Sequence, residues 1–204
     1  MQFVDKDQNN EKRNKKDYRM KVFVLQWYGP FHNLDDIRDW ESDNGDDTYL
    51  YIFRGKKKNA KKYTYYCGQA FYQSAGKRMK NTYHHVQEVI DRSDVLDIWV
   101  GKIVNTVPGK DDVNKIENLL ISFMHQYLIS PPDEMSNETN YYRPQCQIYI
   151  INEWYNTRTD EIPVYKRGSL CSLLPDVIAH YPHKETKTSS VYCAKKLSPI
   201  TELK

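Results

Sequence analysis

One acidic residue, Glu117, stands among apolar positions in a segment that predicts a helix over residues 111–129. On a helix of about 3.6 residues per turn, Val113, Leu120 and Ile121 fall on the same side as this glutamate. An ionised carboxylate in that position is costly unless a cation or hydrogen-bond donors meet it. A metal ion, an arginine or a different helix phase would each account for it.

Two tyrosine-rich segments, 49–53 and 63–67, are typical of strands, and the polar loop between them predicts a β-hairpin. Side chains alternate along a strand, so Tyr49 and Tyr51 are expected on one face of the first strand. In the second strand, Tyr66 is expected to point away from its neighbouring tyrosines.

Arg78 stands near the start of a second predicted helix, which opens at about Gly76. His85 falls on the same side of that helix as Arg78, whereas His84 falls on the far side. His85 is therefore the better placed partner for the arginine, with an ordinary solvated histidine as the alternative. The apolar stripe of this helix consists of Met79, Tyr83, Val86 and Ile90.

The loop of the predicted hairpin is basic, and two lysines flank Arg78 in the helix that follows. Positive charge beside a reactive site could meet phosphate groups. A solvated surface loop accounts for the same charges equally well. The candidate nucleic-acid-binding residues are Arg54, Lys56, Lys57, Lys58, Lys61, Lys62, Lys77 and Lys80.

Taken in order, these motifs resemble the core of the GIY-YIG nuclease family. The matching stretches are Tyr49-Leu50-Tyr51, Tyr66-Cys67-Gly68, Gly76-Lys77-Arg78 and Glu117-Asn118-Leu119-Leu120-Ile121. The sequence departs from the family pattern at Tyr49, Leu50 and Cys67. The resemblance extends over about residues 48–140.

The resemblance implies an endonuclease that hydrolyses DNA phosphodiester bonds with one divalent cation, Mg²⁺ or Mn²⁺. Glu117 would hold the metal, and Arg78 would contact the scissile phosphate. Tyr51 or Tyr66 would activate water. Nearby positive charge would then have to lower the tyrosine pKa from its usual value of about 10.

The family also places an asparagine in a loop after its metal-binding helix. Asn137 and Asn140 both lie in such a loop here, and we assign the role to Asn140. Many relatives carry a lysine three residues after the tyrosine of the second motif. Gln69 occupies that position in this chain, so the missing charge would have to come from His85 or Lys77.

Composition narrows the class of protein. The net charge is only +3, so total charge predicts no partner. Four cysteines stand without any C-x-x-C pairing, which argues against zinc and for reduced thiols. No apolar run approaches the roughly 20 residues of a membrane span, and no signal peptide is evident. We expect a soluble cytoplasmic protein without membrane contact.

The resemblance implies an α/β (α+β) fold, with a small three-stranded antiparallel sheet flanked by helices and a C-terminal β-hairpin extension. Residues 95–104 would be the third strand, and residues 147–154 and 162–166 the hairpin. We expect a flexible tail at 1–19, a strand and short helix at 20–47, the nuclease core at 48–140 and a packed extension at 141–204.

Two other functions are compatible with these residues. A catalytically weak or inactive nucleic-acid-binding module would bind DNA without metal and would not cleave it. A protein-interaction domain, whose tyrosines form the contact surface, would show no salt-dependent affinity for DNA. Substrate specificity, biological role and oligomeric state are not determined by these motifs.

Overall fold

The computed structural model describes residues 20–45, 47–71, 73–80, 86–137, 144–156, 164–165, 173–183 and 189–194. The strands are β1 (Lys21–Phe31), β2 (Thr48–Lys56), β3 (Thr64–Gln69), β4 (Val95–Ile103), β5 (Glu134–Met135), β6 (Ile148–Asn156), β7 (Val164–Tyr165), β8 (Val177–Pro182) and β9 (Ser189–Ala194). The helices are α1 (Leu34–Asn44), α2 (Ala75–Met79), α3 (Val86–Asp91) and α4 (Lys110–Phe123), which a π-helical turn, η3 (Met124–Leu128), continues.

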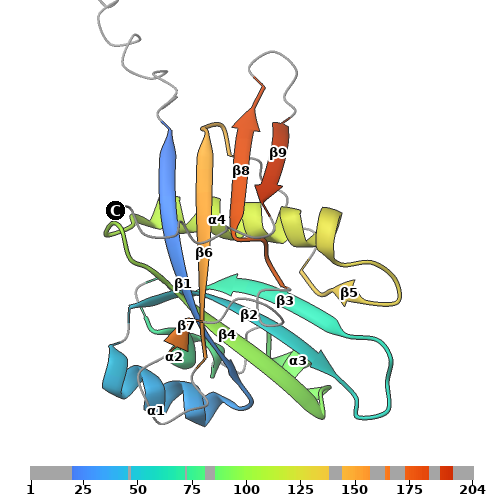
Figure 1. Cartoon of the computed structure of the whole chain (residues 1–204). Coiled ribbons are helices and arrows are strands. Elements are labelled where there is room, and N and C mark those ends of the chain that lie inside the picture. Colours follow the sequence, from blue (N-terminus) through green and yellow to red (C-terminus); the bar gives the residue numbers. More distant parts are fainter. Residues whose placement is uncertain are drawn as a thin grey trace, which may run out of the picture.

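Within the described residues, nine strands form one mixed, curled sheet (Figure 1). The strand order is β5-β3-β2-β4-β1-β6-β8-β9, and β7 pairs with β6. The β1–β6 and β3–β5 pairs are parallel, and the other pairs are antiparallel. Figure 1 shows α4 crossing behind β6 and β8, with α1 and α2 together near the far end of β1.

The prediction of a small three-stranded sheet flanked by helices is wrong. The predicted strands exist as β2, β3 and β4 and pair antiparallel, but they form one part of a larger sheet. The expected N-terminal strand, β1, lies between β4 and β6 rather than outside the core. An alternating pattern specifies which faces of a strand are buried, but leaves open which strands lie beside it.

The expected C-terminal hairpin is also corrected. Tyr155 of β6 does pair with Tyr165 of β7 in antiparallel fashion, yet β7 is only two residues long. The longer partner of β6 is β1, from Lys21↔Ile148 to Tyr28↔Tyr155. Together with β8 and β9, β6 therefore continues the sheet that contains β1 and β4, and the hairpin is only a small part of this region.

Alternation along β2 divides its side chains between two hydrophobic clusters. Leu50 and Ile52 pack toward α4, whereas Tyr51 and Phe53 pack on the opposite face with residues of α1, α2 and α3. Tyr49 packs with the first cluster, because the ladder to β4 shifts register between Thr48 and Leu50. The prediction that Tyr49 shares a face with Tyr51 is therefore wrong.

Local signals placed α1 and α4 close to their expected positions, whereas the single helix expected from about Gly76 to Ile90 is described as two short helices, α2 and α3. Asn33 caps α1, and its Oδ1 accepts a hydrogen bond of 2.8 Å from the Asp36 backbone N–H. The helix expected over 111–129 is present as α4 and η3. Among the described residues, no helix is both long and apolar enough to cross a membrane.

Candidate active site

The two motif tyrosines lie together between β2 and β3. Tyr51 pairs with Gly68 across the ladder, and Phe53 pairs with Tyr66. The rings of Tyr51 and Tyr66 are nearly parallel, with centroids 6.1 Å apart and 6° between their planes. Both rings are buried, with exposed fractions of 0% and 7%. The pair therefore stacks diagonally across the hairpin, as long aromatic side chains can.

Gly68 leaves the space that the ring of Tyr51 occupies. A Cβ atom at position 68 would lie 2.5 Å from Tyr51 Cζ and 2.6 Å from its hydroxyl oxygen. Both distances are far shorter than ordinary contact distances between non-bonded atoms. The glycine of the second motif is therefore required by the position of the first-motif tyrosine.

The helix that carries Arg78 is tied to α1 at its beginning. The Ala75 N–H donates to Thr48 Oγ1 at 3.0 Å, and the Gly76 N–H donates to Glu41 Oε2 at 3.1 Å. The Thr48 hydroxyl also donates to Glu41, whose side chain is buried. These bonds satisfy backbone donors that a helix start leaves open, and they orient the short helix α2.

Arg78 itself is half-buried. Within the described part of the chain, no carboxylate lies within ion-pair distance of its guanidinium. Burial raises the pKa of Tyr51, Tyr66 and Glu117, and the charge of Arg78 opposes part of that rise in each. The guanidinium of Arg78 therefore influences the ionisation of the three residues that the motif resemblance places in the same site.

Glu117 is half-buried on α4, as its apolar neighbours predict. Burial raises its pKa, while hydrogen bonds donated by the side chain and backbone of Gln69 and the charges of Lys110 and Arg78 lower it. The net direction is upward. A half-buried carboxylate that is costly to ionise is stabilised by a divalent cation.

Gln69, which replaces the family lysine, belongs to a polar chain along α4. Lys110 Nζ donates to Gln69 Oε1 at 2.9 Å, and Gln69 Nε2 donates to Asn114 Oδ1 at 2.5 Å. Lys110, Asn114 and Glu117 follow the helical spacing that places side chains on one face. That spacing could have identified Lys110 as the source of the missing charge, and sequence reasoning overlooked it.

Burial controls the chemistry of the tyrosines. It raises the pKa of Tyr66 to about 12, with Glu117 adding to the rise and Arg78 opposing it. Burial and the neighbouring Tyr66 raise the pKa of Tyr51 as well. Both hydroxyls are therefore protonated at neutral pH and can donate hydrogen bonds. A role as base requires further positive charge beside them.

Alkaline pH is expected to destabilise the protein through Tyr66. The unfolded tyrosine titrates near 10.0 and the folded one near 12, so the unfolded state loses its proton first. The protonated Tyr66 hydroxyl contributes fully to the free energy of unfolding below pH 10. This contribution, about 3 kcal/mol, is lost as the pH rises through 12. Tyr66→Phe should lose less stability than wild type in urea unfolding between about pH 9 and about pH 11. Tyr127→Phe, which changes an exposed tyrosine, is the control and should lose as much unfolding free energy as wild type over this pH range. An equal loss in Tyr66→Phe and wild type would contradict the prediction.

A metal ion at this site would have few ligands from the chain. Among the described residues, no group of three His, Cys, Asp or Glu side chains is arranged to hold one. Glu117 would therefore act with water and phosphate oxygens. Mg²⁺ accepts such a set, because it keeps several waters and commonly binds through one or two carboxylates and substrate phosphates. The residues present fit a cation shared with substrate.

Several of the predicted phosphate-binding cations have carboxylate partners. Arg54 Nη2 lies 2.6 Å from Asp97 Oδ2, and the guanidinium stacks over the rings of Tyr63 and Trp99. Three more of the predicted cations form ion pairs with a carboxylate: Lys57 with Asp94, Lys62 with Glu134, and Lys80 with Asp35. Lys56 lies 4.5 Å from the centroid of the Tyr63 ring, while Lys58, Lys61 and Lys77 are exposed. The loop is less positive than its sequence suggests.

A groove of about 430 Å³ nevertheless lies at the loop end of the hairpin, beside α3 and β5. Its lining includes Lys56, Lys57, Lys62 and Arg92, the last of which sequence reasoning overlooked, together with Glu134, whose carboxylate pairs with Lys62. Tyr51 lies four residues along β2 from Gly55 in this groove, or roughly 13 Å. The groove and the tyrosine site thus occupy the two ends of one strand pair.

The structure separates the two candidate asparagines. Asn137 joins the second motif, because its Nδ2 donates to the Cys67 carbonyl at 2.5 Å and its Oδ1 accepts from the Cys67 N–H at 3.4 Å. Asn140 lies outside the described residues, as does His85, so the roles assigned to them stay predictions.

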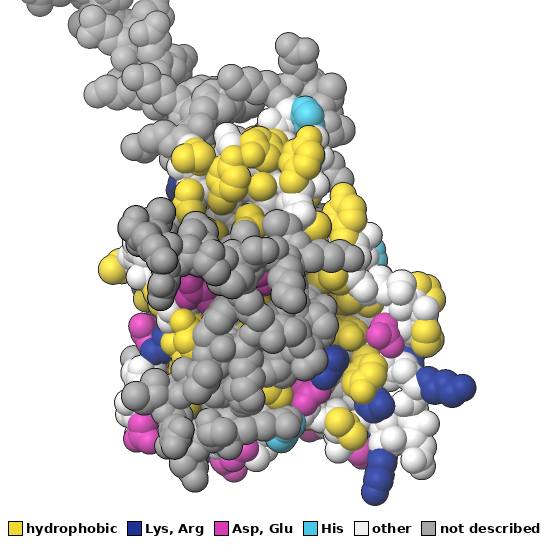
Figure 2. All heavy atoms as spheres, in the orientation of Figure 1, with side chains coloured by type: hydrophobic (Ala, Val, Ile, Leu, Met, Phe, Trp, Pro, Cys, Tyr) yellow, Lys and Arg dark blue, Asp and Glu magenta, His cyan; other side chains and the backbone are white. Residues whose placement is uncertain are grey.

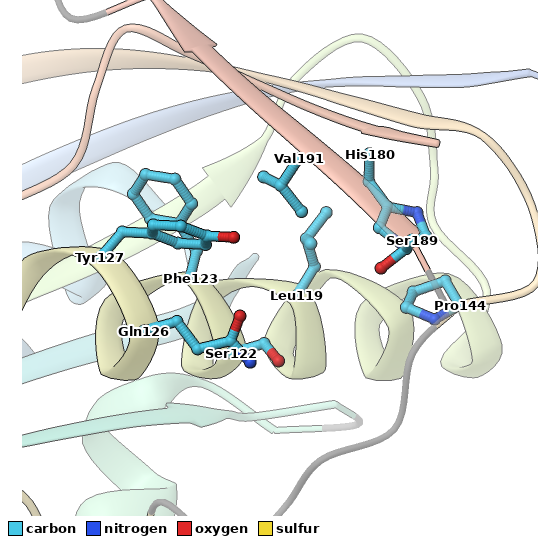
Figure 3. A pocket seen from close by; sticks show the side chains of 9 residues that line it. All are labelled: Leu119, Ser122, Phe123, Gln126, Tyr127, Pro144, His180, Ser189 and Val191. Atoms are coloured by element: carbon cyan, nitrogen blue, oxygen red, sulfur yellow. The ribbon is translucent and has the colours of Figure 1, made fainter. Parts of the chain in front are cut away.

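Another pocket, between α4–η3 and β8–β9, contains none of the predicted residues (Figure 3). Figure 3 shows Leu119 and Phe123 from the helix facing His180 and Val191 from the strands. We take Tyr51, Tyr66, Arg78 and Glu117 as the candidate site. Lys110 and Gln69 lie beside Glu117, whereas the two tyrosines pack with α2 on the face of the sheet opposite α4. Comparison of the chain with protein-family profiles, curated proteins and solved structures finds no match.

Proposed function

We propose that this protein is a metal-dependent DNA endonuclease with the catalytic residues that its resemblance to GIY-YIG nucleases implies. The proposal concerns residues and chemistry, because the fold differs from that expectation. The observation that supports it most is the stacked, buried pair of Tyr51 from β2 and Tyr66 from β3: burial raises the pKa of both, and the charge of Arg78 from α2 opposes that rise. Shifted titrations gathered from separate elements are typical of functional sites.

In this proposal each group has a role set by its chemistry. The guanidinium of Arg78 would bind the scissile phosphate, whose oxygens its planar fork matches. The protonated hydroxyl of Tyr66 would position water and the phosphate by hydrogen bonding, and the fully buried Tyr51 would hold the Tyr66 ring in place. Glu117 would hold a divalent cation, which supplies Lewis acidity at the phosphate and the leaving oxygen. Lys110, through Gln69, would replace the family lysine.

DNA would be the partner, and the cytoplasm the place of action. The basic groove beside α3 would hold a phosphate group away from the site of cleavage. It lies roughly 13 Å from Tyr51 along β2, which is about the rise of four nucleotides along one strand of duplex DNA, at roughly 3.4 Å each. The exposed lysines of the loop, Lys58 and Lys61, would add attraction that salt weakens.

A plasmid-nicking assay tests this function directly. Wild-type protein is expected to nick DNA with Mg²⁺ or Mn²⁺ and to stop in EDTA. Arg78→Ala is expected to lower the rate by about a hundredfold or more, because one charge contact to the transition state is lost. Arg38→Ala is the matched control, since Arg38 is an exposed arginine of α1 that pairs with Asp35. The proposal would be contradicted if the folded wild-type protein cut no form of DNA, or if it cut DNA equally well in EDTA.

A nucleic-acid-binding module without catalysis is the second candidate. The observation that favours it is Gln69, an uncharged residue where many relatives of the family have lysine. The raised pKa of Tyr66 points the same way, because a tyrosine protonated at neutral pH is a poor base. DNA binding in EDTA that weakens with salt, together with absent cleavage in Mg²⁺, would select this function.

A further inference from the structure

The pocket between α4–η3 and the strands β8 and β9 is separate from the candidate active site (Figure 3). Its volume is about 100 Å³. Leu119, which lines it, follows Glu117 by two residues and therefore lies roughly 200° around α4 from that carboxylate. None of the described residues that line the pocket belongs to the proposed nuclease site.

The helical wall of the pocket contains a π-helical turn. The Ile129 N–H donates to the Met124 carbonyl, five residues earlier, at 2.8 Å. This turn, η3, brings Gln126 and Tyr127 to the pocket beside Phe123. Turns of this kind are rare, and they occur frequently at functional sites. The turn is therefore a reason, independent of the cavity itself, to place a ligand here.

The opposite wall is supported from both faces of the sheet. His180 of β8 pairs with Val191 of β9, and both side chains line the pocket. The His180 Nδ1–H donates to the Cys146 carbonyl at 3.2 Å, which holds the ring in the wall. Hydrophobic side chains cover the outer face of the same strands (Figure 2), where the rings of Tyr149 and Tyr181 meet at 5.8 Å. The pocket is thus formed before a ligand arrives, which lowers the entropic cost of binding.

The size of the pocket limits its ligand to one ring. A dry cavity of about 150 Å³ binds a single benzene molecule, and this pocket is smaller. Leu119, Phe123 and Val191 offer apolar surface to the faces of a flat ring. Gln126 and Tyr127 are exposed, so the pocket opens to solvent beside them and one edge of the ring can remain outside.

The lining favours an uncharged ligand. Among the described residues that line the pocket, none is Lys, Arg, Asp or Glu. An ionised ligand would lose water there without gaining a countercharge. A nucleotide would bring its phosphate to the same uncharged rim. The ligand is therefore a free, uncharged molecule and not a nucleotide or a base carried by DNA.

Three polar side chains of the lining favour a ring that forms hydrogen bonds. Within the part of the chain that the structure describes, the side chains of Ser122, Gln126 and Ser189 have no hydrogen-bond partner. A hydroxyl and a carboxamide can each both donate and accept a hydrogen bond. A ring with donors and acceptors on its edge satisfies these groups, whereas a hydrocarbon ring leaves them without a partner in the complex.

We propose that this pocket binds a free, uncharged, single-ring heterocycle that carries both hydrogen-bond donors and acceptors, as a pyrimidine base does. The site needs no metal and no DNA. It therefore goes beyond the proposed endonuclease function.

The test is a titration of the full-length, isotope-labelled protein with uracil, followed through its amide resonances by nuclear magnetic resonance. The side-chain amide of Gln126 and the backbone amide of Val191 are expected to shift. Gln126→Ala should weaken binding roughly fivefold, because one polar partner of the ring is lost. Gln87→Ala is the matched control, since Gln87 is a glutamine of α3 that bonds to Asp91 away from the pocket.

Two further comparisons test the size and the charge of the site. Val191→Phe fills the pocket and should abolish binding of uracil, whereas Val107→Phe adds the same bulk at a residue that is 90% exposed and should leave binding unchanged. Orotate, which is uracil with a carboxylate, and uridine monophosphate should each bind at least roughly tenfold more weakly than uracil.

Three outcomes would overturn this pocket as a binding site. Uracil could leave the resonances of the pocket unshifted in folded wild type, Gln126→Ala could bind uracil as tightly as wild type, or orotate or uridine monophosphate could bind as tightly as uracil. Binding of uracil by folded protein that cuts no DNA would support the pocket while counting against the nuclease, so failure of one proposal is distinguished from failure of the other.

Discussion

Replacing Glu117 by glutamine is expected to lower metal-dependent DNA cleavage on the order of a thousandfold and to leave the protein folded. Glutamine keeps the size of the side chain but loses the charge that would hold the cation. Arg78 and the two tyrosines would remain, so substrate binding in EDTA should change little. The rate is measured by plasmid nicking over a range of Mg²⁺ concentrations, because extra metal cannot restore a missing ligand.

The stability of this variant provides an independent check on the site. Burial raises the folded-state pKa of Glu117 above its usual 4.5. The wild type therefore loses stability as the pH rises from the unfolded-state pKa through the folded-state pKa of this carboxyl group. Glu117→Gln removes this loss, and its thermal midpoint at neutral pH should equal or exceed that of wild type. Glu134→Gln is the control, because Glu134 is an exposed glutamate that pairs with Lys62. A folded Glu117→Gln protein that nicks DNA at the wild-type rate would contradict the proposed role.

The second large effect is expected from Gly68→Ala, which should destabilise the fold by about 3 kcal/mol. The new methyl group would lie 2.5 Å from Tyr51 Cζ. The Tyr51 ring cannot easily move away, because it stacks on Tyr66 and meets Phe53 edge to face at 5.8 Å. Urea unfolding at neutral pH measures the change.

Two comparisons establish the cause of that loss. Gly109→Ala adds the same methyl group where no atom lies within 4 Å, and should cost less than about 1 kcal/mol. In a Tyr51→Leu background, Gly68→Ala should cost much less than in wild type, since the clashing ring is gone. Strict additivity of the two changes would show that the contact with Tyr51 is not responsible.

Much of the local structure could be predicted from the sequence. The alternation of apolar and aromatic residues indicated the β2–β3 hairpin, which pairs antiparallel from Leu50 to Gly55. Asn33 before an acidic turn predicted the start of α1. The apolar neighbours of Glu117 predicted its half-buried position on α4. Each inference depends on residues within a few positions of one another, where backbone geometry alone decides the outcome.

The rest depends on contacts between residues far apart in the chain. The neighbours of β1 are β4 and β6, and no periodic pattern specifies which strand edges meet. The guanidinium of Arg54 is paired with the carboxylate of Asp97, a residue of another strand, and so contributes less positive charge for binding phosphate. Lys110 reaches the candidate site because α4 packs beside β3 and brings it to Gln69. The sequence by itself determined the elements and the types of side chain they carry. Only the tertiary structure decided which charges meet, because burial and pairing depend on how distant segments pack together.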